Sequence, residues 1–173
     1  KHDLACLLHE QPFRGVNGSG KHNNWSLTTD TGHNLFSPGK EPETNKQFQL
    51  FMCAVIRAVD ENQDLLRISV ATAGNDRRLG GNEAPPAIIS MFLGDYITNI
   101  LTSVEEGHGT EEWNAEKMET GVASVPEFLK DKSDRNRTSP FAFTGNKFEF
   151  RSLGANASIS DANVVLNTAV AES

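Results

Sequence analysis

The amino-acid sequence predicts an α+β fold, because the strand-like and helix-like segments do not alternate regularly along the chain. Two segments carry this prediction. From Phe48 to Val59, apolar residues recur at the spacing of one face of a long helix. Near the other end, residues 147–151 alternate charged and aromatic side chains, which is the pattern of a strand with one buried face.

Four segments precede the long helix. Residues 4–8 form an apolar run and predict a buried strand. Residues 11–21 carry three glycines and predict a loop. Residues 23–29 alternate polar and apolar side chains, which predicts a second strand, and residues 30–43 predict a turn-rich connection.

The long helix is predicted to begin at Thr44, because Thr44 and Gln47 have the spacing of a capping box. Its end is expected near Ser69. The apolar stripe indicates a side that packs against a core rather than a ligand site. The stripe consists of Phe48, Phe51, Met52, Val55, Ile56 and Val59.

The segments after this helix are mixed. Residues 73–86 are rich in glycine and are expected to be irregular, either as a solvated loop or as a mobile flap that closes a site. Residues 87–92 predict a short strand and residues 94–104 a helix. Residues 105–133 are polar, acidic and weakly patterned, which indicates a surface insertion.

The last part of the chain predicts a hairpin and a helix. Residues 140–144 and 147–153 have strand patterns, and the Gly145-Asn146 pair between them suits a tight turn. Ser160 is the expected cap of a final helix. The residues expected on the buried side of that helix are Ala162, Val165, Leu166, Ala169 and Val170.

Composition limits the function classes. The chain has 173 residues, enough for one domain, and a net charge of −7 argues against a nucleic-acid partner. No apolar stretch approaches the roughly 20 residues of a membrane span. Cys6 and Cys53 lie in apolar runs and are expected to be buried free thiols, so a cytoplasmic location is expected. Apolar runs lie close to both ends of the chain, which predicts a piece of a larger protein.

The charged face of residues 147–151 is the first candidate site. Lys147, Glu149 and Arg151 share one face of the predicted strand, opposite Phe148 and Phe150. A carboxylate between two cations can hold a metal ion while the cations hold anions. The alternative is a half-exposed sheet with a solvated charged face.

The glycine-rich loop is the second candidate. Residues 15–22 nearly match a phosphate-binding P-loop, but His22 replaces the hydroxyl residue that would hold magnesium. The residues after Lys21 suit a strand better than the helix that a P-loop needs. His22 itself is a candidate metal ligand, the alternative being a plain surface histidine.

Three segments in this order resemble the catalytic domain of glutamine synthetases, and most closely its type III branch: NGSGKHNNWSL (17–27), RLGGNEAPP (78–86) and RNRTSPFAFTGNKFEFR (135–151). The resemblance covers nearly the whole chain and is weakest over residues 105–133. It implies that residues 1–173 are part of a catalytic domain. It also implies a curved, mostly antiparallel half-barrel sheet flanked by helices, the fold shared with the guanido kinase catalytic domain.

The resemblance also implies binding roles. The implied ligands of a divalent metal, Mg²⁺ or Mn²⁺, are His22 and Glu149. The implied contacts to the substrate glutamate are Asn17, Gly18, Arg78 and Arg151. Because the spacing between Arg78 and Glu83 is one residue shorter than in the common types, Arg77 stays open as an alternative to Arg78.

The implied contacts to ATP are Ser26, Arg137 and Lys147. The implied catalytic residues are Arg137 and Glu83, the latter shielding the intermediate and taking a proton from ammonium. The family's other carboxylate metal ligands come from an upstream segment that nothing in this chain resembles. The chain alone is therefore predicted to lack synthetase activity.

The resemblance implies a glutamate–ammonia ligase that forms glutamine with ATP through γ-glutamyl phosphate, working as a ring-shaped homo-oligomer in the full-length protein. No membrane or nucleic-acid partner is expected. One alternative is a ligase of the same fold that uses another amine, although Glu83 favours ammonia. Another is a non-catalytic nucleotide-binding assembly subunit, against which the joint presence of His22, Glu83, Glu149 and Arg151 argues.

Overall fold

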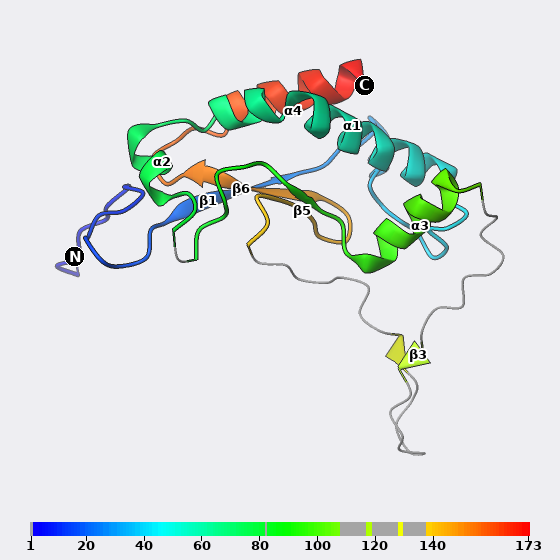
Figure 1. Ribbon diagram of the computed structural model, residues 1–173, viewed down its shortest axis with the longest axis horizontal. Helices are drawn as coiled ribbons and strands as arrows, with labels where there is room; N and C mark the ends of the chain where they lie inside the picture. The colour runs from blue at the N-terminus through cyan, green and yellow to red at the C-terminus, as the bar shows by residue number, and fades with distance from the viewer. Residues whose placement is uncertain (1, 82, 108–116, 119–127, 130–137) are drawn as a thin grey trace.

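A mixed four-stranded sheet with the order β1-β6-β5-β2 organises the chain (Figure 1). The computed structural model describes residues 2–81, 83–107, 117–118, 128–129 and 138–173. The elements are β1 (Gly20–Trp25), α1 (Lys46–Ile68), α2 (Ala73–Arg78), β2 (Met91–Phe92), α3 (Asp95–Glu105), β3 (Lys117–Met118), β4 (Phe128–Leu129), β5 (Phe141–Phe143), β6 (Phe148–Gly154) and α4 (Ser160–Glu172).

The predicted α+β class is confirmed. Strand β6 lies between β1 and β5 and pairs antiparallel with both, while β2 pairs parallel with β5. The short strands β3 and β4 form a separate antiparallel pair. They fall within the predicted insertion over residues 105–133, most of which lies outside the described residues.

The core lies between one face of the sheet and the helices α1 and α4, which run side by side above it (Figure 1). Alternation in β6 turns Phe148 and Phe150 into this core, where both are fully buried. Phe141 of β5 stacks on Phe148 with ring centroids 4.8 Å apart. Burying each such ring stabilises the fold by about 1.5–3 kcal/mol, so the aromatic face holds the hairpin against the helices.

Polar side chains join β1 to α4. Trp25 Nε1 donates a hydrogen bond to Asn167 Oδ1 at 2.9 Å, and Asn23 Nδ2 donates to Asn163 Oδ1 at 2.8 Å. Because Asn23 and Trp25 face the helix, the residues between and beside them face the other side of the sheet. This places His22 and Asn24 opposite the core.

Several predicted elements are confirmed with shifted ends. The long helix ends at Ile68 as expected, but its N-cap is Asn45, not Thr44: Asn45 Oδ1 accepts a hydrogen bond from the Phe48 amide at 3.1 Å. The final helix begins at Ser160, yet Ile159 occupies the cap position without a side-chain bond. The hairpin forms between β5 and β6, where Phe143 pairs with Phe148.

The other boundary predictions were less accurate. Strand β1 corresponds to the strand predicted at residues 23–29. It starts at Gly20 and ends at Trp25, earlier than predicted at both ends. Within residues 73–86, which were expected to be irregular, Ala73–Arg78 forms the short helix α2. The predicted strand 87–92 is reduced to Met91–Phe92. A strand persists only where a neighbour completes its backbone hydrogen bonds, and sequence patterns do not show where that neighbour ends.

The predicted buried strand at residues 4–8 is wrong. These residues form no strand, and Leu4, Leu7 and Leu8 are 88%, 56% and 64% exposed. An apolar run becomes a strand only when a partner strand pairs with it, and no described segment does so here. The expectation of buried thiols is also wrong, because Cys6 and Cys53 are free but exposed.

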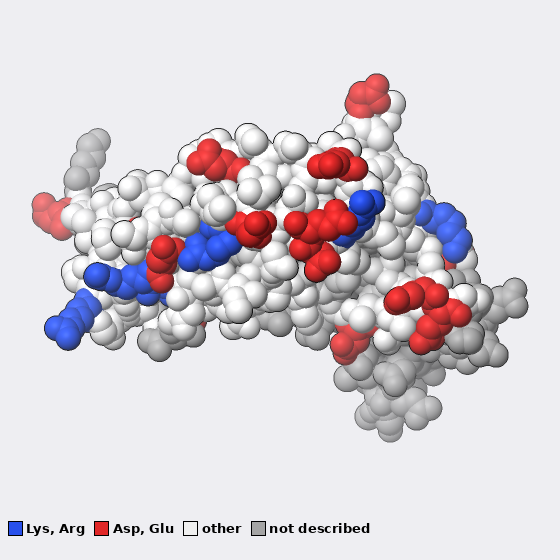
Figure 2. Space-filling view, turned by 45° about the horizontal axis from the view of Figure 1, so that its top comes forward, with Lys and Arg blue, Asp and Glu red and all other residues white. Residues whose placement is uncertain are grey.

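The face of the molecule over α1 and α4 is predominantly acidic. Figure 2 shows more acidic than basic side chains on it, in keeping with the net charge of −7. Of the described helices, none is long and apolar enough to cross a membrane.

Asn75 of α2 supports the fold from a fully buried position. Its Nδ2 donates to the carbonyls of Val70 and Ser152, each at 2.8 Å, and its Oδ1 accepts from Arg78 Nε at 3.1 Å. These bonds join α2 to β6 and to the end of α1. An alanine here would leave three buried polar groups without a partner.

We expect Asn75→Ala to lower the free energy of unfolding by about 3 kcal/mol, measured by denaturant titration of the chain. The matched control is Asn99→Ala on α3, where the side chain is exposed and a change within about 0.5 kcal/mol is expected. Equal destabilisation by the two variants would contradict the role assigned to Asn75.

Candidate functional site

The pairing of β1 with β6 forms the frame of the candidate site. Lys21 pairs with Leu153 and Asn23 pairs with Phe150, so one residue of β1 faces two residues of β6 between these pairs. This is a β-bulge, which re-aims side chains locally. It turns Leu153 into the core and leaves His22 on the face opposite the core.

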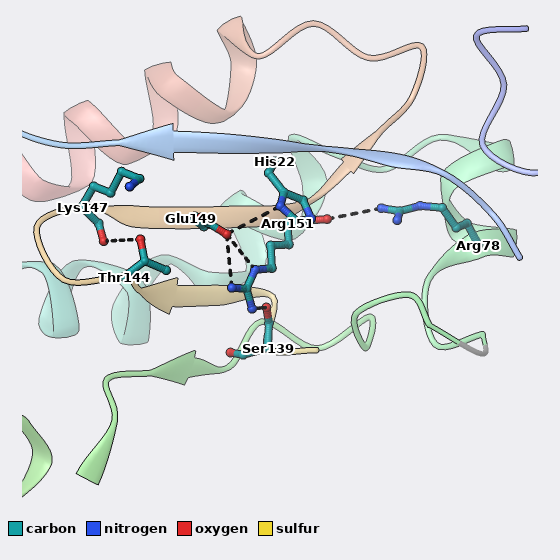
Figure 3. A network of polar contacts seen from close by, with 7 residues as sticks. All are labelled: His22, Arg78, Ser139, Thr144, Lys147, Glu149 and Arg151. Carbon is teal, nitrogen blue, oxygen red and sulfur yellow. Dashed lines mark hydrogen bonds and ion pairs between the residues drawn. The ribbon is translucent and has the colours of Figure 1, made fainter. Parts of the chain in front are cut away.

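His22, Glu149 and Arg151 meet on that face (Figure 3). His22 Nδ1 lies 3.6 Å from Glu149 Oε2. Arg151 Nε donates a hydrogen bond to the same carboxylate oxygen at 3.2 Å, and Nη2 forms an ion pair with it at 3.2 Å. Arg151 Nη1 donates to the Ser139 carbonyl at 3.4 Å. The guanidinium therefore holds the carboxylate in place while the imidazole remains 59% exposed.

Arg78 lies beneath the glycine-rich loop and is 6% exposed. Its Nη2 donates to the backbone carbonyls of Arg151 at 3.4 Å and Leu153 at 3.2 Å. A Cβ added at Gly20 would lie 2.6 Å from the guanidinium carbon, and one at Gly18 would lie 2.7 Å from Cγ. Only glycine lets the loop approach the arginine so closely.

Burial lowers the pKa of Arg78 below its ordinary value, and the negative charge of Glu10 opposes that shift. Glu10 is itself buried, at 7% exposure. The sequence did not predict a role for this residue, for Asn75 or for Ser139. No local pattern marks any of them, because each depends on contacts with segments distant in the chain.

The other predicted residues fall along the same strand pair. Trp25 of β1 pairs with Phe148 of β6. Ser26 follows Trp25 and Lys147 precedes Phe148, so both lie at the end of the strand pair that is far from Arg78. In the described part of the chain Lys147 makes no ion pair with Glu149. At the near end, Asn17 is exposed on the loop that also contains Gly18.

One described residue of the predicted set is not brought to this group. Glu83 is exposed in the turn that follows α2, and Arg137 lies outside the described residues. Of the two arginines considered, Arg77 is exposed, while Arg78 is held by β6. The structure therefore gathers His22, Glu149 and Arg151, and it places Arg78 and Gly18 at one end of this group. Glu83 lies apart from them.

The expectation that residues 15–22 are not a true P-loop is confirmed. Lys21 lies inside β1, and the chain continues as a strand to Trp25. A P-loop binds phosphate with the free amides at the start of a helix, and no helix follows the loop here.

The donor set suits a divalent metal ion in part. An imidazole nitrogen and a carboxylate oxygen on one face are ligands that Mn²⁺ and, through the carboxylate, Mg²⁺ accept. Within the described residues, no group of three or more histidine, cysteine, aspartate or glutamate side chains is placed to bind a metal. The pair would need further ligands from outside these residues.

Comparison with known proteins gives the family. The chain matches no protein-family model. It is 56% identical over 173 residues, its whole length, to a type-3 glutamine synthetase of Dictyostelium discoideum. It is 52% identical over 174 aligned residues to a glutamine synthetase of Bacteroides fragilis, and 58% identical over 161 residues to one of Butyrivibrio fibrisolvens.

These alignments cover 100%, 99% and 93% of this chain. The chain spans 24%, 24% and 23% of the length of the three relatives. Identity above 50% across nearly every residue places the chain in the glutamine synthetase family.

Proposed function

We propose that the chain forms part of the catalytic domain of a glutamate–ammonia ligase, which makes glutamine from glutamate, ammonia and ATP through γ-glutamyl phosphate. Identity of 52–58% to proteins named glutamine synthetase supports this proposal. The observation that carries it is the approach of His22 Nδ1 to within 3.6 Å of Glu149 Oε2. In this proposal the sheet is part of a larger curved half-barrel.

The order of residues along β1 and β6 suits the two substrates. Arg78 and Arg151 lie toward one end and would hold the carboxylates of glutamate. Ser26 and Lys147 lie toward the other end and would contact ATP. His22 and Glu149 lie close to each other beside Arg151, and a divalent ion held by them would supply positive charge at the transferred phosphoryl group.

Each residue then has a definite task. A bound Mg²⁺ or Mn²⁺ would supply positive charge against the ATP phosphates. Arg151 keeps the Glu149 carboxylate oriented toward His22. Lys147, with Arg137, would neutralise charge on the transferred phosphoryl group, and Glu83 would take a proton from ammonium once the flap closes. Closure would also keep water from the acyl phosphate.

The proposed activity can be tested in an exchanged synthetase, meaning the Dictyostelium discoideum protein with its 173 matching residues replaced by this chain. We expect it to form glutamine from glutamate, ammonia and ATP when Mg²⁺ is present. An exchanged synthetase that folds like the unmodified protein but makes no glutamine would contradict the proposal. Turnover with an amine but not with ammonia would point instead to the amine ligase.

In the exchanged synthetase, Glu149→Gln should lower kcat/KM on the order of 100-fold or more, because it removes a charged metal ligand without changing shape. The Mg²⁺ concentration needed for half-maximal activity should rise as well. The control is Glu61→Gln, which alters an exposed carboxylate on α1. Unchanged turnover in Glu149→Gln would favour a non-catalytic assembly subunit.

The chain by itself should form no detectable glutamine, because its described residues supply only two adjacent metal-type side chains. The measurement is ATP- and ammonia-dependent glutamine production at high concentrations of the purified chain. Activity that disappears on adding a chelator would show that the chain holds a complete site, contrary to this expectation.

A further inference from the structure

Glu10 is a buried carboxylate to which the proposed reaction gives no task. Its Oε1 accepts a hydrogen bond from the Asn156 amide at 3.2 Å. Two glycines lie close to its carboxylate. A Cβ atom added at Gly154 would lie 2.5 Å from Oε1, and one added at Gly74 would lie 2.7 Å from Oε2. The chain therefore builds a fitted space for this side chain at the meeting of β6 and α2.

The backbone of Glu10 also contacts the glycine-rich loop. Its carbonyl accepts a hydrogen bond from the Ser19 amide at 2.7 Å, and a Cβ at Gly18 would lie 2.6 Å from the same oxygen. Glu10 thus touches the loop, α2 and β6. These are the same three segments that enclose Arg78.

A cation enclosed in this way needs a compensating charge. Arg78 donates to one side-chain amide and to backbone carbonyls, none of which carries a net charge. The carboxylate of Glu10 acts on it through space, and it is the charge that opposes the effect of burial on the Arg78 pKa. A buried charge without such compensation is strongly unfavourable.

We infer that Glu10 is a positioning residue of the glutamate site: its buried carboxylate compensates the charge of the Arg78 guanidinium and keeps it in place beneath the glycine-rich loop. This inference rests on the proposed function, in which Arg78 and Gly18 contact the substrate glutamate. Glu10 acts through Arg78 and the loop, and it touches neither substrate nor metal. It should therefore affect the binding of glutamate and leave the binding of ATP unchanged.

The test uses Glu10→Gln in the exchanged synthetase. Glutamine has nearly the same shape and can still accept the bond from the Asn156 amide, so only the charge is removed. We expect the KM for glutamate to rise about tenfold with the KM for ATP little changed. The melting temperature should fall, because the buried charge of Arg78 is no longer compensated. Glu10→Asp keeps the charge and should recover part of the affinity for glutamate.

A double-mutant cycle with Arg78→Lys shows whether Glu10 acts through Arg78. Arg78→Lys replaces the guanidinium on which the Glu10 carboxylate acts. In that background, Glu10→Gln should have a much smaller effect on the KM for glutamate. Glu61→Gln serves again as the control, with no change in either KM. If the double variant raises the KM for glutamate by the product of the two single-variant factors, the inference is overturned.

Three further results would also overturn it. One is an unchanged KM for glutamate in Glu10→Gln. Another is an equal rise in both KM values, which would show a purely structural role. Absence of activity before any change at Glu10 would overturn the proposed function itself and, with it, this inference.

Discussion

Between Phe150 and Leu153, β6 carries one residue more than the part of β1 that it faces. The alternation of a strand would otherwise place Leu153 on the same side as Glu149. The bulge returns Leu153 to the core and holds His22 above the carboxylate. The remaining polar contacts of the site depend on this shift, because it fixes which side chains share the open face.

A second constraint is the burial of charge beside the glycine-rich loop. Arg78 is buried against three segments, two of which, the loop and β6, lie far from it in the sequence. The loop contributes glycines that allow close approach, α2 contributes the Asn75 amide, and β6 contributes backbone carbonyls. Such an arrangement is favourable only when nearly every polar group finds a partner, and these contacts join the loop, the helix and the strand.

The accuracy of the sequence predictions varies with the range of the interactions involved. The hairpin around Phe148 and the long helix were predicted because their periods reflect contacts repeated every few residues. The strand at residues 4–8 was wrong, since an apolar run shows hydrophobicity but not whether a partner strand is present. The helix cap was misplaced by one residue because Thr44 and Asn45 both suit the position.

By itself the sequence determined the α+β class, the charged face of β6 and the segments that resemble the glutamine synthetases. These follow from residue types and short spacings, which a linear chain displays directly. Only the tertiary structure decided that His22 meets Glu149, that Arg78 is enclosed, and that Glu10 is buried beside Gly74 and Gly154. The reason is physical: burial of a charge depends on surfaces brought together by folding, and no period in the sequence records which surfaces those are.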